Sequence, residues 1–116
     1  MLAGGLCIAA GDTAYSSINT CSDTTWDSYG ATNPYCATNY WAGAKKKCSE
    51  QGMRLPNQTE LNTIYTNKAT ISGLISVWYW ADTDYSNDGA LGFDLRGNPS
   101  NTGSVKHVSE GVRCVK

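Results

Sequence analysis

The cysteines of this chain constrain its fold more than any other feature of its sequence. Five of them occur within 116 residues, and no two stand in the Cys-x-x-Cys spacing of a structural zinc site. A chain this short and this rich in cysteine is typical of disulfide-bonded proteins in an oxidising compartment. Since five is an odd number, we expect one thiol that is free or pairs outside the chain. The five are Cys7, Cys21, Cys36, Cys48 and Cys114.

The charge balance argues against a nucleic-acid partner. Nine basic and ten acidic side chains give a formal net charge of −1, whereas proteins that follow a phosphate backbone carry a basic excess on one face. The local basic cluster, Lys45-Lys46-Lys47, falls in a predicted helix. We expect all three lysines to face water.

The first ten residues are apolar but do not predict a membrane span. They are too few to cross a bilayer, and they contain no positively charged n-region of the kind that begins an export signal. Leu6 stands where a lipoprotein cleavage box needs a small residue, so we do not expect Cys7 to carry a lipid. We expect that an export signal or a longer N-terminal segment preceded Met1, and that this fragment does not insert into a membrane.

A first helix is predicted from the spacing of its apolar residues. Trp41, Ala44 and Cys48 stand at i, i+3 and i+7, which places them on one face. Either residue of the Thr38-Asn39 pair can cap its start, and Gly52 can adopt the left-handed conformation that ends it.

A second helix follows directly. Asn57 and Glu60 have the spacing of a capping box, in which each side chain bonds the other residue's backbone amide. Leu61 and Ile64 contribute to its apolar face. We expect this helix to end near Lys68.

Beyond residue 73 the pattern changes to the two-residue period of strands. Leu91, Phe93 and Leu95 alternate with polar or small residues, which predicts one buried face, and residues 81–89 are a predicted polar loop. We predict strands at residues 76–81, 91–95, 104–108 and 111–115. Two helices followed by an antiparallel sheet predict an α+β domain.

The N-terminal part has no such periodicity. In residues 1–36, Ser, Thr, Asp, Asn and Gly interrupt every short apolar run, which predicts irregular structure with one or two short strands. We expect Trp26, Tyr29 and Tyr35 to pack inward from it.

Five short motifs occur in order along the rest of the chain. They are Trp41-Ala42-x-Ala44-x-x-x-Cys48, Gly52-Met53-Arg54-Leu55-Pro56, Glu60-Leu61, Trp78-Tyr79-Trp80 and Gly111-Val112-Arg113-Cys114-Val115. Together they resemble the C-type-lectin-like fold, and most closely its bacterial branch, which includes the Legionella collagen-like protein C-terminal domain family. The ending is also similar to that of formylglycine-generating enzymes and of the variable proteins of diversity-generating retroelements.

The resemblance implies an organisation in two parts. It covers about residues 40 to 116, so we expect residues 1–36 to form an irregular N-terminal extension packed on a C-type-lectin-like domain at residues 37–116. In that fold two helices pack on a small antiparallel sheet.

The resemblance also implies a disulfide between the first helix and the last strand, here Cys48 to Cys114. In the entropic model a loop of about 65 residues closed in this way stabilises the fold by roughly 4 kcal/mol. Among the other cysteines we expect Cys21 to pair with Cys36, which leaves Cys7 free. The competing arrangement pairs Cys7 with Cys21 and leaves Cys36 free.

The sequence does not predict an enzyme. It has no Gly-x-Ser-x-Gly elbow, no metal-binding histidine pair and no glycine loop that opens a helix. The single histidine, His107, is expected to be a surface or hydrogen-bonded residue. No cysteine lies between Cys48 and Cys114, so the copper-binding pair of formylglycine-generating enzymes is absent. We predict no catalytic residue and no cofactor.

Calcium-dependent sugar binding remains a minor alternative. Animal lectins of this fold use a Glu-Pro-Asn or Gln-Pro-Asp loop and a Trp-Asn-Asp strand. This chain offers only Asn98-Pro99-Ser100 and Trp80-Ala81-Asp82, in reversed order. A calcium site needs about six to eight oxygen ligands, and we assign no metal ligand. Some of the oxygens could come from Asp82, Asp84, Asn87 and Asp88.

The resemblance places two loops, at about residues 79–90 and 97–106, on the exposed side of the sheet. Tyrosine offers a rigid apolar ring with a polar tip, and asparagine adapts its hydrogen bonds, which suits recognition of a protein or glycan receptor. The predicted ligand-binding residues are Tyr79, Asp82, Asp84, Tyr85, Asn87, Asp88, Asn98, Asn101 and His107.

Three functions follow as hypotheses. The first is an extracytoplasmic adhesion domain, secreted or on the cell surface or a pilus tip, that displays variable loops on a disulfide-bonded scaffold. The second is the variable protein of a diversity-generating retroelement, diversified from about Val77 to Val112. The third is a structural, pilin-like subunit.

Overall fold

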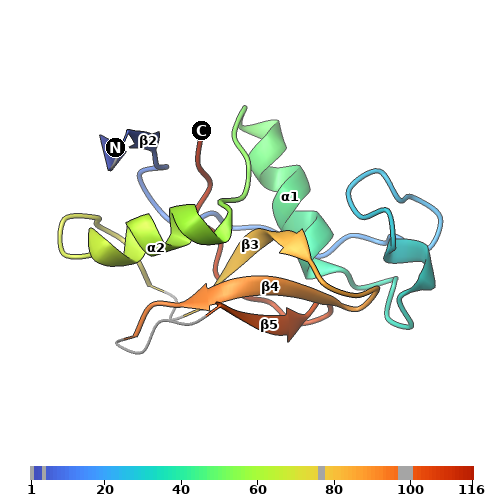
Figure 1. Ribbon diagram of the computed structural model, residues 1–116. Helices are drawn as coiled ribbons and strands as arrows, with labels where there is room; N and C mark the ends of the chain where they lie inside the picture. Colours follow the sequence, from blue (N-terminus) through green and yellow to red (C-terminus); the bar gives the residue numbers. More distant parts are fainter. Residues whose placement is uncertain (1, 4, 76–77, 97–100) are drawn as a thin grey trace.

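The computed structural model describes residues 2–3, 5–75, 78–96 and 101–116. A three-stranded antiparallel sheet in the order β3-β4-β5 forms its centre, and α2 packs along β3 and β4 while α1 packs against β3 (Figure 1). The domain is therefore α+β, as predicted. The elements are β1 (Leu2–Ala3), β2 (Leu6–Cys7), the short 3-10 helix η1 (Gly30–Thr32), α1 (Tyr40–Glu50), α2 (Gln58–Thr66), β3 (Trp78–Asp84), β4 (Gly89–Asp94) and β5 (Asn101–Val105).

Local capping signals place both helices where they were predicted. The Asn39 side chain accepts a hydrogen bond from the amide of Ala42 at the start of α1, and Gly52 follows its end with a φ of 70°. At α2, Asn57 and Glu60 form the reciprocal capping box. Glu60 also accepts two hydrogen bonds from the guanidinium of Arg54, at 2.6 and 2.8 Å, which lowers the pKa of its carboxyl.

The strands differ from their predicted bounds. β3 continues to Asp84, which pairs with Ala90 in β4, so only residues 85–88 remain as a turn. β5 ends at Val105, because the backbone then turns inward and the carbonyl of Lys106 accepts from the amide of Tyr40. The predicted strand at residues 111–115 is instead a set of isolated bridges, with Gly111 lying beside Tyr79 of β3.

Two buried clusters make up the core. One lies between α2 and the sheet and contains Leu61, Ile64, Tyr79 and Phe93, together with Ile8 from the N-terminal segment. The other surrounds the disulfide of α1, and its large members are Trp41, Leu55, Trp80 and Val112.

Both expected disulfides are present. Cys48 bonds Cys114, with the two Cα atoms 5.5 Å apart, and Cys21 bonds Cys36. Cys7 is free, so the competing pairing of Cys7 with Cys21 is not formed.

The N-terminal segment runs antiparallel to the end of the chain. Cys7 and Lys116 exchange two backbone hydrogen bonds, and the amide of Ala9 donates to the carbonyl of Cys114. Close by, the buried guanidinium of Arg113 donates from Nε to Oδ1 of Asp12 at 3.0 Å. The two ends of the chain thus lie together, toward the opposite end of the molecule from the β3–β4 turn (Figure 1).

Candidate ligand-binding site

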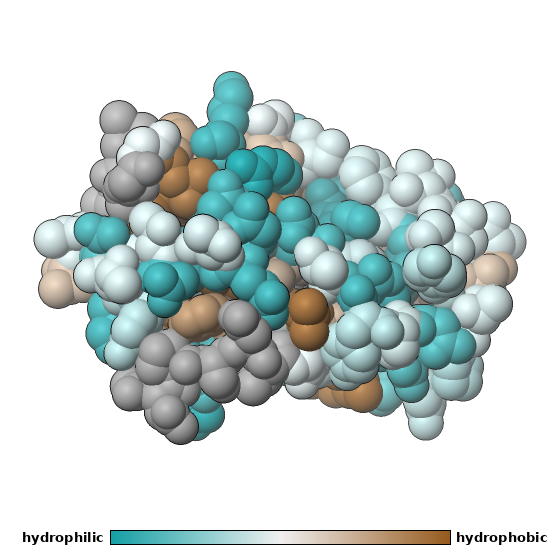
Figure 2. Space-filling view, in the orientation of Figure 1, coloured by the Kyte–Doolittle hydropathy of each residue, from teal (hydrophilic) through white to brown (hydrophobic). Residues whose placement is uncertain are grey.

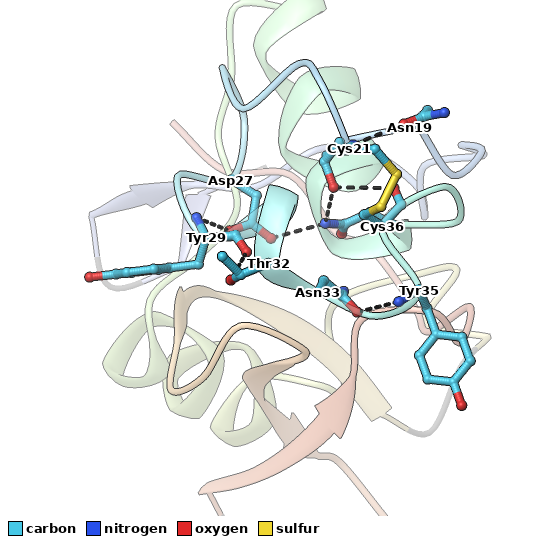
Figure 3. The surroundings of a disulfide bond; sticks show 10 residues. Asn19, Cys21, Asp27, Tyr29, Thr32, Asn33, Tyr35 and Cys36 are labelled. Carbon is cyan, nitrogen blue, oxygen red and sulfur yellow. Dashed lines mark hydrogen bonds between the residues drawn. A yellow bond between two sulfur atoms is a disulfide. The ribbon is translucent and has the colours of Figure 1, made fainter.

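The disulfide loop of residues 21–36 is shaped by short side-chain-to-backbone hydrogen bonds. Oδ1 of Asp27 accepts from the amide of Tyr29, and Oδ1 of Asn33 accepts from the amide of Tyr35. Such Asx turns fix the direction of the chain. Figure 3 shows the two tyrosine rings pointing away from the loop in different directions, and both are more than half exposed. The expectation that they pack inward is wrong.

A buried lysine joins this loop to the sheet. The Lys106 side chain is fully excluded from solvent, and its Nζ lies 2.9 Å from Oδ2 of Asp27 and 3.1 Å from Oδ2 of Asp84. It also donates to the carbonyl of Ser86 at 3.0 Å and lies 4.7 Å from the centre of the Trp41 ring. The two carboxylates and the ring compensate the lysine for the loss of water.

Lys45 contacts the same tryptophan ring as Lys106. Its Nζ lies 4.3 Å from the centre of the Trp41 ring, and burial lowers the pKa of its ammonium, although the carboxylates of Asp27 and Asp84 oppose that shift. Of the three lysines predicted to face water, Lys46 and Lys47 do so and Lys45 does not.

The disulfide loop and the β3–β4 turn enclose an open pocket of about 440 Å³. Its two aromatic walls are Tyr29, whose exposed fraction is 59%, and Tyr85, at 57%. The ring of Tyr85 lies against the hairpin, because a Cβ added to Gly89 or Gly103 would overlap it. The pocket is lined by Tyr29, Asp84, Tyr85, Ser86 and Asn87.

Hydrogen bonds hold the polar wall of the pocket in place. Nδ2 of Asn87 donates to the carbonyl of Thr32 at 2.9 Å, which ties the turn directly to the disulfide loop. The hydroxyl of Ser86 donates to Oδ1 of Asp88 at 3.0 Å. The turn that carries Tyr85 is therefore fastened to the disulfide loop that carries Tyr29.

Three of the predicted ligand-binding residues meet in this pocket: Asp84, Tyr85 and Asn87. Asp82 is exposed on β3 and accepts from the hydroxyl of Thr83. Asp88 is the last residue of the turn, and its backbone carbonyl accepts a hydrogen bond from the amide of Lys106.

Tyr79 does not lie on the surface, contrary to prediction. It is fully buried because β4 and Gly111 flank its strand and the core cluster beneath α2 covers its ring. Its hydroxyl donates to Oδ2 of Asp12 at 2.7 Å.

The remaining predicted residues lie apart from the pocket or outside the described residues. His107 is half-buried and stacks on Tyr35, with ring centres 3.9 Å apart, and its Nδ1 is buried with no hydrogen-bond partner among the described residues. Asn101 pairs through its backbone with Phe93 at the start of β5. Asn98 lies outside the described residues.

The carboxylates of the turn do not converge on one point. Asp84 pairs with Lys106, Asp88 with Ser86 and Asp82 with Thr83. Within the described part of the chain, no group of three or more His, Cys, Asp or Glu side chains could hold a metal ion.

A second hollow, of about 400 Å³, lies between residues 14–18 and α1. It contains none of the predicted ligand-binding residues, and its charged side chains belong to the outer face of the helix. It is lined by Ala14, Tyr15, Ser16, Ile18, Gly43, Lys46, Lys47 and Glu50.

Tyr29 and Ser86 are the pocket residues that the sequence did not reveal. The sequence of an irregular segment does not show whether a tyrosine in it packs inward or points outward. The contact that brings the disulfide loop to the turn, between Asn87 and Thr32, joins segments that are far apart in the sequence.

No protein-family model matches the chain, and no curated protein matches it significantly. In the described part of the chain, no helix combines the length and the apolar character that crossing a membrane requires.

Proposed function

We propose that this chain is an extracytoplasmic binding module with a C-type-lectin-like fold, which recognises a protein or glycan receptor through the pocket between Tyr29 and Tyr85. The observation that carries the proposal is that two exposed tyrosines, from segments far apart in the sequence, line one pocket. Tyrosine side chains of this kind give contact area at a low cost in conformational entropy.

The connectivity supports the fold that we propose. A disulfide links α1 to the end of the chain, the two chain ends lie together, and the loops that build the pocket lie away from them (Figure 1). A framework closed in this way leaves its loops free to vary in sequence.

The two disulfides support a place outside the cytoplasm. Disulfides persist in oxidising compartments and are rare where thiols are kept reduced. The bond between Cys21 and Cys36 closes the loop that carries Tyr29, so an oxidising environment preserves one wall of the pocket.

The chemistry of the pocket favours binding over catalysis. Its carboxylate, Asp84, is held by the ammonium of Lys106. The histidine of the chain stacks on Tyr35, which does not line the pocket. A carboxylate or imidazole that acts as a general base in the pocket would have to come from one of these groups.

The proposal is tested by screening the intact, oxidised protein against arrays of glycans and of extracellular proteins, and then comparing two variants. Tyr29→Ala removes one wall and should weaken binding to any hit by about fivefold or more, the order expected for one aromatic contact. Tyr35→Ala is the matched control, since Tyr35 comes from the same loop and is 54% exposed but does not line the pocket. Absence of any hit, or equal binding by both variants, would contradict the proposal.

A further inference from the structure

We infer that the ligand of this pocket is the neutral sugar ring of a glycan, stacked on tyrosine and bound without calcium. The inference rests on the proposed function and narrows it to one ligand class. It follows from the charge of the pocket, from its polar groups and from the partners that the nearby carboxylates already engage.

The pocket offers an anionic ligand no counter-charge. Among the described residues that line it, none is a lysine, arginine or histidine. The ammonium beneath it, on Lys106, is fully buried and already shared by Asp27 and Asp84. A sialic acid, uronic acid or sulfate group would approach Asp84 without a cation to bind it, which is unfavourable.

Its polar groups suit hydroxyls instead. Nδ2 of Asn87 is occupied by the carbonyl of Thr32, so the amide is fixed and its oxygen takes no hydrogen bond from the described residues. Sugar hydroxyls can donate to that oxygen and accept from the tyrosine hydroxyls. An exposed tyrosine ring also offers apolar surface to the C–H face of a pyranose.

Figure 2 agrees with a site of this kind. On the face shown, the end of the molecule formed by the disulfide loop and the β3–β4 turn carries mainly weakly hydrophilic residues, and apolar side chains do not gather there in one broad patch. A flat protein interface with an apolar centre would show such a patch.

Calcium is not required by this arrangement. A calcium site takes several anionic oxygens that point at one place, whereas the carboxylates of Asp82, Asp84 and Asp88 each engage a different partner. The carboxylate of Asp84 already engages Lys106 at 3.1 Å, which weakens its attraction for a cationic ligand such as a quaternary ammonium; competition by choline tests this alternative.

The test is a glycan array that contains neutral, sialylated, sulfated and uronic-acid-bearing glycans, read in calcium buffer and again in EDTA. Titration of the strongest neutral hit, and competition by methyl pyranosides or by choline chloride, follow by calorimetry. We expect hits among the neutral glycans alone, affinities within about twofold in EDTA, and weak dependence on salt, since no ion pair forms.

Three variants tie the binding to the pocket. Tyr29→Ala should reduce affinity by about fivefold or more, whereas Tyr29→Phe keeps the ring and should retain most of it. Tyr35→Ala should bind like the parent protein. Tyr85 is left in place because its ring covers Gly89 and Gly103.

The possible failures are distinguishable. Hits confined to anionic glycans, loss of binding in EDTA, competition by choline, or a protein receptor that needs Tyr29 would each overturn the neutral-sugar inference and leave the proposed function standing. Binding that ignores Tyr29, or no binding at all, would overturn both.

Discussion

The ammonium of Lys106 lies 2.9 Å from a carboxylate oxygen of Asp27, and both side chains are completely buried. This ion pair joins the disulfide loop to the segment that follows β5, and Asp84 extends it to the β3–β4 turn. One buried cation thus helps to position both segments that supply a tyrosine to the pocket, namely the disulfide loop with Tyr29 and the β3–β4 turn with Tyr85.

Lys106→Met should be severely destabilising. The substitution keeps much of the side-chain volume but leaves two carboxylates without their cation, and breaking a buried pair in this way costs about 3–5 kcal/mol. The measurement is the free energy of unfolding in urea. Lys46→Met, on the exposed face of α1, is the control and should change it by less than about 0.5 kcal/mol. Equal losses in the two variants would mean that the carboxylates regain water without cost.

The two disulfides should contribute differently. Replacing Cys48 and Cys114 with alanine opens a loop with a sequence separation of 66 and should cost about 4 kcal/mol. The corresponding change at Cys21 and Cys36, with a separation of 15, should cost about 3 kcal/mol.

Limited proteolysis separates the local effect from the global one. Without the bond between Cys21 and Cys36, cleavage should begin within residues 21–36 while the rest of the domain stays folded. Cys7→Ser is the control, since Cys7 forms no disulfide. Cleavage spread evenly over both double variants would contradict a local role for this bond.

Features set by local sequence could be predicted, and features set by distant contacts could not. The helices begin where they were expected because the capping residues Asn39 and Asn57 act within their own turns. The strand ends were misplaced because pairing across the sheet fixes them, as between Asp84 and Ala90.

The same distinction explains the site. Asp84, Tyr85 and Asn87 are close in sequence and stay together in space, so a polar loop was enough to find them. Asp12 and Asp27 lie in irregular segments, and no local sequence signal sets them apart from other loop aspartates. Their partners, Arg113 and Lys106, lie far along the chain; Asp27 is completely buried with Lys106, and Asp12 is partly buried with Arg113.

Gly43→Ala should destabilise the protein although it removes a glycine from a helix. Helix propensity alone predicts a gain of about 1 kcal/mol. However, a Cβ at this position would overlap the backbone carbonyl of Ser16, which packs directly on α1. Overpacking against backbone costs about 1–3 kcal/mol, so we expect a net loss of about 1 kcal/mol in urea unfolding. Ser49→Ala, exposed on the same helix, is the control and should be neutral or stabilising; a gain at Gly43 would show that residues 14–18 can move away freely.

Glu110→Gln should stabilise the protein at neutral pH. Burial raises the pKa of the Glu110 carboxyl above its ordinary value of 4.5, against the opposing effect of a hydrogen bond from Ser104. The folded state therefore holds this proton more tightly than the unfolded chain does. The stability that protonation contributes is fully present below pH 4.5, and it is lost as the pH rises through the folded-state pKa.

Glutamine imitates the protonated carboxyl at every pH, and its amide oxygen can still accept from Ser104. The variant should therefore unfold at higher urea concentration than the parent protein at pH 7, and the difference should shrink as the pH falls toward 4.5 and vanish below it. Glu50→Gln, on the exposed end of α1, is the control for the loss of one negative charge. A Glu110→Gln variant that is less stable than the parent at pH 7, or a difference that does not change with pH, would mean that Glu110 is held in its charged form by interactions stronger than its hydrogen bond with Ser104.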